Sequence, residues 1–140
     1  MKYYKKADLK VECIVSDEDF EFFGVCFDDI LDRTEAGMHF IKRVKELCAM
    51  TQNITWTNIA YTLNISMLPD GRVSLEFSEC ISDYITSLKH SMAMADEETL
   101  DPLKEFIQAL EESDEEHARK LVARFEKSVK RFSKPAKNAD

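Results

Sequence analysis

The stretch from Tyr61 to Phe77 constrains the fold of this chain more than any other part of its 140 residues. Apolar and polar side chains alternate strictly on both sides of a Pro-Asp-Gly sequence, which predicts two β-strands joined by a tight turn. A two-residue loop would put the two apolar rows on opposite faces of the sheet. A three-residue loop brings them together, in the pairs Met67 with Val73, Ile65 with Leu75, and Leu63 with Phe77. The sequence therefore predicts a hairpin with one apolar face, with Pro69 in a type I turn and Gly71 in the left-handed bulge position.

An isolated hairpin is marginal in water, so the preceding chain must cover this apolar face. Leu9 to Val15 alternate as a first strand, and Ser16 begins a short acidic helix that Gly24 ends. A further helical start follows at residues 27–31, and Thr34 caps a longer helix that runs to about residue 50. The apolar stripe of the longer helix consists of Phe40, Ile41, Val44, Leu47 and Cys48. Residues 1–90 therefore form an α+β domain, a small antiparallel sheet with helices packed on one face.

Residues after the hairpin follow a helical period. Apolar side chains at residues 81–88 predict a helix that leaves the sheet, and residues 89–95 are typical of a linker. Asp101-Pro102 marks the next helix, and residues 113–116 form a capping box that opens a last one. Residues 96–132 are therefore predicted to form a C-terminal helical hairpin, followed by a disordered tail at residues 133–140. The acidic residues lie mostly in the first helix of this hairpin and the basic residues in the second.

Composition narrows the range of functions. The chain has a net charge of −8, with 44% hydrophobic and 33% charged residues, which is a globular balance that disfavours general affinity for nucleic acid or anionic membranes. The N-terminal residues lack the pattern of a signal peptide and no stretch approaches membrane-spanning length, so we expect a cytoplasmic protein. Cys13, Cys26, Cys48 and Cys80 are scattered, which favours reduced thiols over a zinc site.

No motif in the sequence predicts catalysis. A glycine-rich phosphate loop and a GxSxG nucleophile elbow are both missing, and the chain contains only three glycines. The histidines, His39, His90 and His117, lie on different predicted elements. We therefore expect a protein that is not an enzyme and that has no cofactor, metal or catalytic residues.

Two charged regions are candidates for binding a partner. The tentative partner-binding residues are the acidic Asp17, Glu18, Glu21, Asp28 and Asp29. They form either a solvated helical face or a surface that recruits a basic protein. The basic last helix is the alternative: a regulator that contacts nucleic acid through Arg119, Lys120, Arg124, Lys127, Lys130 and Arg131. A third hypothesis is a thiol sensor that uses Cys26 or Cys48.

The linear pattern over residues 11–79 resembles the N-terminal domain of the MecA adaptor family, the negative regulators of genetic competence. The resemblance rests on a strand followed by Ser-Asp-Glu-Asp-Phe-x-x-x-Gly at 16–24, on Asp-Asp-Ile-Leu at 28–31, on a long amphipathic helix, and on the hairpin at 63–79. It implies a non-enzymatic adaptor that captures a protein substrate or a transcription regulator for a Clp-type unfoldase in regulated proteolysis. The residues after Glu79 depart from the family, because they are too few and too helical for its α+β C-terminal domain. They are suited instead to homodimerisation or to contact with a second protein.

Overall fold

A computed structural model describes the backbone of residues 1–138 and the side chains of residues 1–128, and it divides the chain into two compact units. Unit 1 contains Met1–Trp56 and Thr62–Ser78, and unit 2 contains Thr57–Tyr61 and the chain from Glu79 onward. The fold class is mixed α+β, as the sequence predicts. The first unit ends at Ser78 rather than near residue 90, so the helix after the hairpin belongs to unit 2.

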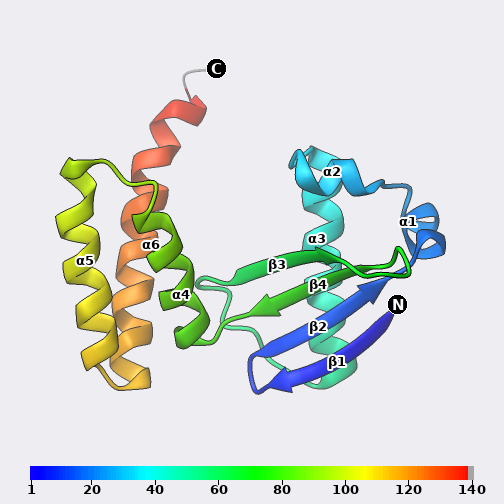
Figure 1. Ribbon diagram of the computed structural model, residues 1–140, viewed down its shortest axis with the longest axis horizontal. Helices are drawn as coiled ribbons and strands as arrows, with labels where there is room; N and C mark the ends of the chain where they lie inside the picture. Colours follow the sequence, from blue (N-terminus) through cyan, green and yellow to red (C-terminus); the bar gives the residue numbers. More distant parts are fainter. Residues whose placement is uncertain (139–140) are drawn as a thin grey trace. The chain divides into compact units, whose positions relative to one another are not determined.

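Unit 1 is built on a four-stranded antiparallel sheet with the order β1-β2-β4-β3 (Figure 1). Its strands are β1 (Lys2–Ala7), β2 (Lys10–Val15), β3 (Thr62–Met67) and β4 (Val73–Ser78). The sequence analysis missed β1, because this edge strand carries lysines and mostly exposed side chains instead of an apolar alternation. The predicted order of elements is therefore corrected by one additional strand at the N-terminus.

The register of the hairpin agrees with the register predicted from the sequence. Residues of β3 and β4 face each other in the pairs Leu63 with Phe77, Ile65 with Leu75, and Met67 with Val73. The N–H of Gly71 donates to the carbonyl of Leu68 at 2.9 Å, and Gly71 has a φ of 88°. Only the three-residue loop keeps both apolar rows on one face, so the loop length and the core pattern select the same structure.

The helices of unit 1 begin and end at the residues that the capping rules indicate. They are α1 (Asp17–Phe23), α2 (Phe27–Leu31) and α3 (Glu35–Gln52). Ser16 forms a capping box with Asp19, and Gly24 ends α1 in the left-handed conformation with a φ of 68°. The side chain of Thr34 accepts a hydrogen bond from the N–H of Gly37 at 3.1 Å and so caps α3.

The core of unit 1 lies between the sheet and α3, which crosses one face of the strands (Figure 1). Its fully buried side chains come from β2, β4 and α3, and include Val11, Cys13, Val15, Val44, Cys48, Leu75 and Phe77. Trp56 closes the core from the connection after α3, and its indole N–H donates to the carbonyl of Lys45 at 2.8 Å. The predicted stripe of α3 is therefore the cover of the hairpin.

Gly37 sits where α3 passes close to α2. A Cβ atom at this position would overlap the backbone carbonyl of Asp29, which no L side chain can avoid. The same carbonyl accepts hydrogen bonds from the N–H and the hydroxyl of Thr34, at 3.1 and 3.3 Å. The close approach of the two helices therefore requires glycine at residue 37.

Unit 2 is built from helices, and two of them have other bounds than the sequence predicts. The helices are α4 (Ile81–Met92), α5 (Glu97–Glu112) and α6 (Glu115–Asn138). Helix α4 includes residues 89–92 of the expected linker. Helix α5 begins after Asp96, whose side chain accepts from the N–H of Thr99, so Pro102 lies inside the helix and does not begin it.

The start of α6 is also one residue later than the capping box suggests. Asp114 accepts a hydrogen bond from the N–H of His117 at 2.7 Å, whereas the hydroxyl of Ser113 donates back to Ala109 at the end of α5. The backbone of α6 is helical to Asn138, over most of the residues predicted to be a disordered tail. Residues 139–140, and all side chains from residue 129, lie outside the described residues.

The predicted pairing of α5 with α6 is extended by α4, which shares their core. The buried centre of unit 2 is Leu110, Ala118 and Val122, and the rings of Phe106 and Phe125 stack beside it at 4.6 Å. The acidic residues of the predicted hairpin lie mostly on α5 and the basic residues on α6. An ion pair at 2.8 Å joins Lys89 of α4 to Glu111 of α5. Among the described residues, no helix combines the length and the apolar character needed to cross a membrane.

Candidate functional site

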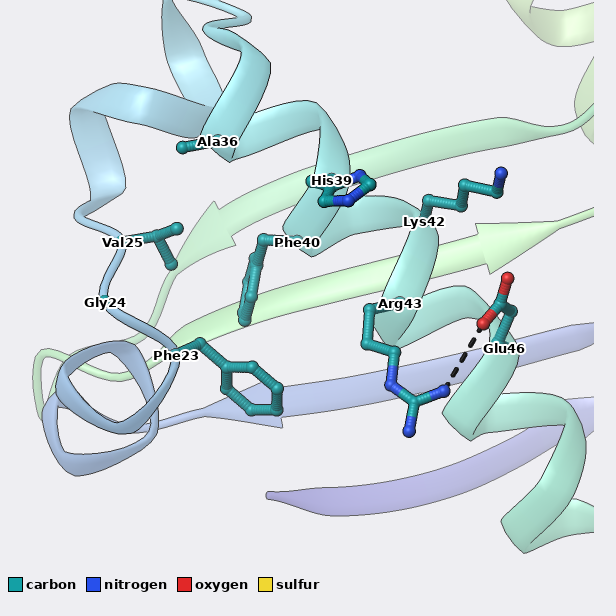
Figure 2. Close-up of a pocket in the computed structure, with 9 residues that line it drawn as sticks. All are labelled: Phe23, Gly24, Val25, Ala36, His39, Phe40, Lys42, Arg43 and Glu46. Atoms are coloured by element: carbon teal, nitrogen blue, oxygen red, sulfur yellow. Dashed lines mark hydrogen bonds and ion pairs between the residues drawn. The ribbon is translucent and has the colours of Figure 1, made fainter.

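A surface pocket of about 480 Å³ lies in unit 1 between the end of α1 and the outer face of α3 (Figure 2). Its lining combines apolar side chains with charged ones. The residues that line it are Phe23, Gly24, Val25, Ala36, His39, Phe40, Lys42, Arg43 and Glu46. We call it the α1–α3 pocket.

Aromatic contacts build the floor of the α1–α3 pocket. Phe40 projects from the buried edge of the α3 stripe, and its ring lies 5.6 Å from Phe20 and 5.3 Å from Phe23. Gly24 turns the chain at the end of α1 and leads to Val25, whose side chain points toward Phe40 (Figure 2). The local folding rules that end α1 therefore also place the apolar wall of the pocket.

Phe22 extends the apolar surface beyond the pocket. Its ring packs edge-on against Phe23 at 5.2 Å, yet 84% of the side chain is exposed to solvent. Isolated exposed apolar residues are common on protein surfaces, whereas contiguous apolar surface is the kind that binding sites use. The sequence analysis assigned no role to these aromatic residues.

Charged side chains on α3 form the rim of the pocket. Lys42, Arg43 and Glu46 are exposed there together with His39. Arg43 pairs with Glu46 at 3.4 Å, and each of these two side chains is more than half exposed (Figure 2). Within the described part of the chain, Lys42 makes no ion pair or hydrogen bond through its side chain. The rim therefore has a cationic excess in a chain of net negative charge.

The five predicted partner-binding residues lie on two helices, and none of them lines the pocket. Asp17, Glu18 and Glu21 belong to α1, and they are exposed, as is Asp28 of α2. Within the described residues, these four side chains form no hydrogen bond or ion pair. Three of them share one helix, so the structure presents them as an acidic surface on α1.

Asp29 has a structural role that the sequence analysis did not assign. Its carboxylate accepts hydrogen bonds from the N–H of Cys26 at 3.0 Å and from the hydroxyl of Thr34 at 3.1 Å. The thiol of Cys26 donates to the same carboxylate at 3.2 Å. The hydrogen bonds from Cys26 and Thr34 lower the pKa of Asp29, so its charge caps α2 and ties α2 to the start of α3.

The two cysteines of the thiol-sensor hypothesis lie in different surroundings, since Cys48 is buried and Cys26 is exposed. Cys48 is fully buried together with Cys13, and a hydrogen bond with Cys48 and burial raise the pKa of the Cys13 thiol. A raised pKa disfavours the thiolate, which is the reactive form. Cys26 is exposed, but its thiol is the donor to Asp29 described above.

The basic residues of the nucleic-acid hypothesis lie on α6, and two of them are already paired. Arg119 contacts Glu115 at 2.9 Å and the backbone carbonyl of Glu79 at 3.2 Å. Lys120 lies 3.7 Å from Glu116. Arg124 and Lys127 are exposed, and the side chains of Lys130 and Arg131 lie outside the described residues. The described part of α6 therefore presents only part of the predicted basic surface.

Comparisons with known proteins identify no relative from which a function could be transferred. The chain matches no protein-family model, no curated protein and no solved structure at a significant level. Over the described residues, no group of three or more His, Cys, Asp or Glu side chains is placed to hold a metal ion. The chemistry of the α1–α3 pocket, an apolar floor with a charged rim, is therefore the basis for assigning a function.

Proposed function

We propose that this chain is a cytoplasmic, non-enzymatic adaptor similar to the MecA family, and that unit 1 captures a protein substrate or a transcription regulator. The observation that carries the proposal is the exposed ring of Phe22 beside the α1–α3 pocket. Interfaces between proteins are enriched in aromatic side chains and in arginine, and a few such residues supply most of the binding free energy. Phe22, Phe23 and Arg43 provide this combination on one surface.

Unit 2 would supply the second contact that an adaptor needs. Its amphipathic helices pack around a small core, and Met94, which follows α4, is 92% exposed. A Clp-type unfoldase is the partner that the resemblance to the MecA family implies for this unit. A homodimer formed through the C-terminal helices is the other occupant of the same surface, although the described residues of the α5 and α6 stripes already pack within unit 2.

Site-specific photocrosslinking of the full chain tests the proposal. A photoreactive phenylalanine at Phe22 is expected to crosslink a defined protein in cells, whereas the same group at exposed Lys5 of β1 serves as the matched control. A second probe at Met94 is expected to crosslink an ATPase-deficient Clp-type unfoldase. Capture at Phe22 without unfoldase at Met94 would mean that the protein sequesters its partner. Equal crosslinking at Phe22 and Lys5 would contradict the proposal.

A further inference from the structure

The α1–α3 pocket also carries information about the chemistry of the partner. We propose that it binds a short segment of the partner protein that has an apolar anchor residue with carboxylates on one side of it. The inference rests on the proposed function, since it specifies what the capture surface of unit 1 recognises. Each part of the proposed segment corresponds to a described feature of the pocket.

The apolar anchor fits the floor of the pocket. Phe23, Val25 and Phe40 line it (Figure 2). Phe22 contacts Phe23 near the end of α1 and does not belong to the lining. The pocket volume of about 480 Å³ is large enough for one aromatic or branched aliphatic side chain with its backbone. Burying such a side chain favours binding in proportion to the apolar surface that is removed from water. An anchor of this type therefore supplies affinity but does not by itself select one partner.

The carboxylates fit the rim that α3 provides. Lys42 and Arg43 line the pocket, while Glu46 is its only acidic lining residue and the exposed acids of α1 are not part of the lining. The Arg43–Glu46 pair is long and exposed, and such pairs contribute little to stability. A carboxylate of the partner can therefore replace Glu46 as the neighbour of Arg43 at small cost, and the guanidinium can hold it through two hydrogen bonds.

The acidic residues of α1 make the pocket more selective for the direction of the bound segment. Asp17, Glu18 and Glu21 are exposed on α1, the helix whose C-terminal end lines the pocket, so they repel a ligand that is acidic along its whole length. A ligand with its carboxylates confined to the α3 side of the anchor avoids this repulsion. Because discrimination depends on unfavourable contacts as well as favourable ones, α1 sets the direction in which the segment lies.

Fluorescence anisotropy with the full chain tests the inference. The probe is a short fluorescein-labelled peptide in which glutamates follow a central Leu-Phe pair. It is compared with a peptide that has lysines in place of the glutamates and with one that has serines in place of the Leu-Phe pair. The glutamate peptide is expected to bind best, and its affinity should fall as salt is raised. Equal binding of the glutamate and lysine peptides would overturn the inference.

Charge-reversal variants locate the binding site. Arg43→Glu and Lys42→Glu are each expected to weaken binding of the glutamate peptide about fivefold, which corresponds to losing one exposed charge contact. Lys5→Glu changes the net charge of unit 1 by the same amount on β1 and should leave the affinity unchanged. All three side chains are exposed, so folding should be preserved, and circular dichroism checks this. Equal weakening by Lys5→Glu would show a non-specific charge effect and overturn the assignment to the pocket.

Two further outcomes separate this inference from the proposed function. Crosslinking of a partner at Phe22, together with peptide binding that is insensitive to charge, would reject the acidic segment but keep the adaptor. A dimer that Arg43→Glu dissociates, measured by light scattering, would identify a second copy as the occupant of the pocket and reject the inference. Absence of both crosslinking and peptide binding would reject the two together.

Discussion

Unit 1 and unit 2 bury their apolar side chains to very different extents. The core of unit 1 joins β2, β4, α1 and α3 with Trp56, and several of its members have no exposed surface. The buried centre of unit 2 is Leu110, Ala118 and Val122, and α4 contributes no fully buried residue at all among those described. Burial of apolar surface is the main source of stability, so unit 1 is expected to be the more stable of the two. The difference suits the proposed roles, in which unit 1 is a rigid capture surface and unit 2 an adaptable second contact.

The largest expected effect comes from the centre of the unit 1 core. Phe77→Ala should lower the free energy of unfolding of unit 1 by about 3–5 kcal/mol, since it removes a fully buried ring from β4. Urea denaturation followed by the fluorescence of Trp56, the only tryptophan, reports on unit 1 alone. Phe22→Ala removes an exposed ring and should change the free energy of unfolding by less than about 0.5 kcal/mol. A similar loss in both variants would contradict the central position of Phe77.

The same experiment in unit 2 should give a smaller loss. Leu110→Ala is expected to cost about 2–3 kcal/mol, the low end for a buried leucine, because partly exposed neighbours can close over the space. The loss is measured by urea denaturation followed by the helical circular dichroism signal, with Lys104→Ala on the exposed face of α5 as control. A cost that equals that of Phe77→Ala would contradict the comparison between the two cores.

Helix capping should affect the two units equally. Ser16→Ala removes the cap of α1 in unit 1, and Asp114→Ala removes the cap of α6 in unit 2. Each substitution is expected to cost about 1 kcal/mol, because one backbone N–H group loses its side-chain acceptor. The same two denaturation signals report the result. If only one unit is destabilised, the helix of the unaffected unit does not depend on its cap.

The last prediction concerns alkaline pH, to which a tyrosine in each unit responds. Burial raises the pKa of Tyr3 to about 12, and burial together with the hydrogen bond to Glu126 raises the pKa of Tyr84. Since the folded pKa lies above the unfolded value of about 10, stability is complete below pH 10 and falls as the pH rises through the folded pKa. Tyr84→Phe should reduce this alkaline loss in unit 2 only, measured by urea denaturation at several pH values. If Tyr84→Phe also reduced the alkaline loss of stability in unit 1, the prediction would be contradicted.

Local patterns predicted the parts of the fold that local chemistry determines. The hairpin register followed from the alternation of side chains and the length of the 69–71 loop, and the bounds of α1 and α3 followed from Ser16, Gly24 and Thr34. Strand β1 was not predicted, because its side chains are mostly exposed and its sequence therefore shows no apolar alternation. The predicted start of α5 at Asp101-Pro102 was wrong, because Asp96 caps the helix further upstream and Pro102 lies inside it.

The candidate site could be predicted only in part. The exposure of Asp17, Glu18 and Glu21 follows from the helical period of α1, but the capping role of Asp29 depends on Cys26 and Thr34. The α1–α3 pocket was not predicted, because its floor and rim come from two helices whose approach is a tertiary property. Phe22 next to Phe23 breaks the helical apolar pattern, and this was the one signal in the sequence that pointed to the surface.

The glycine at residue 37 has a consequence for tracing the ancestry of this chain. Surface residues around the pocket can change as partners change, but a carbonyl that already occupies the place of a side chain permits only hydrogen there. Diverged relatives are therefore expected to retain glycine three residues after a Thr or Ser helix cap, a few residues beyond an Asp-Asp-Ile-Leu-like segment. This spacing is a marker by which the lineage can be recognised even where overall sequence identity has been lost.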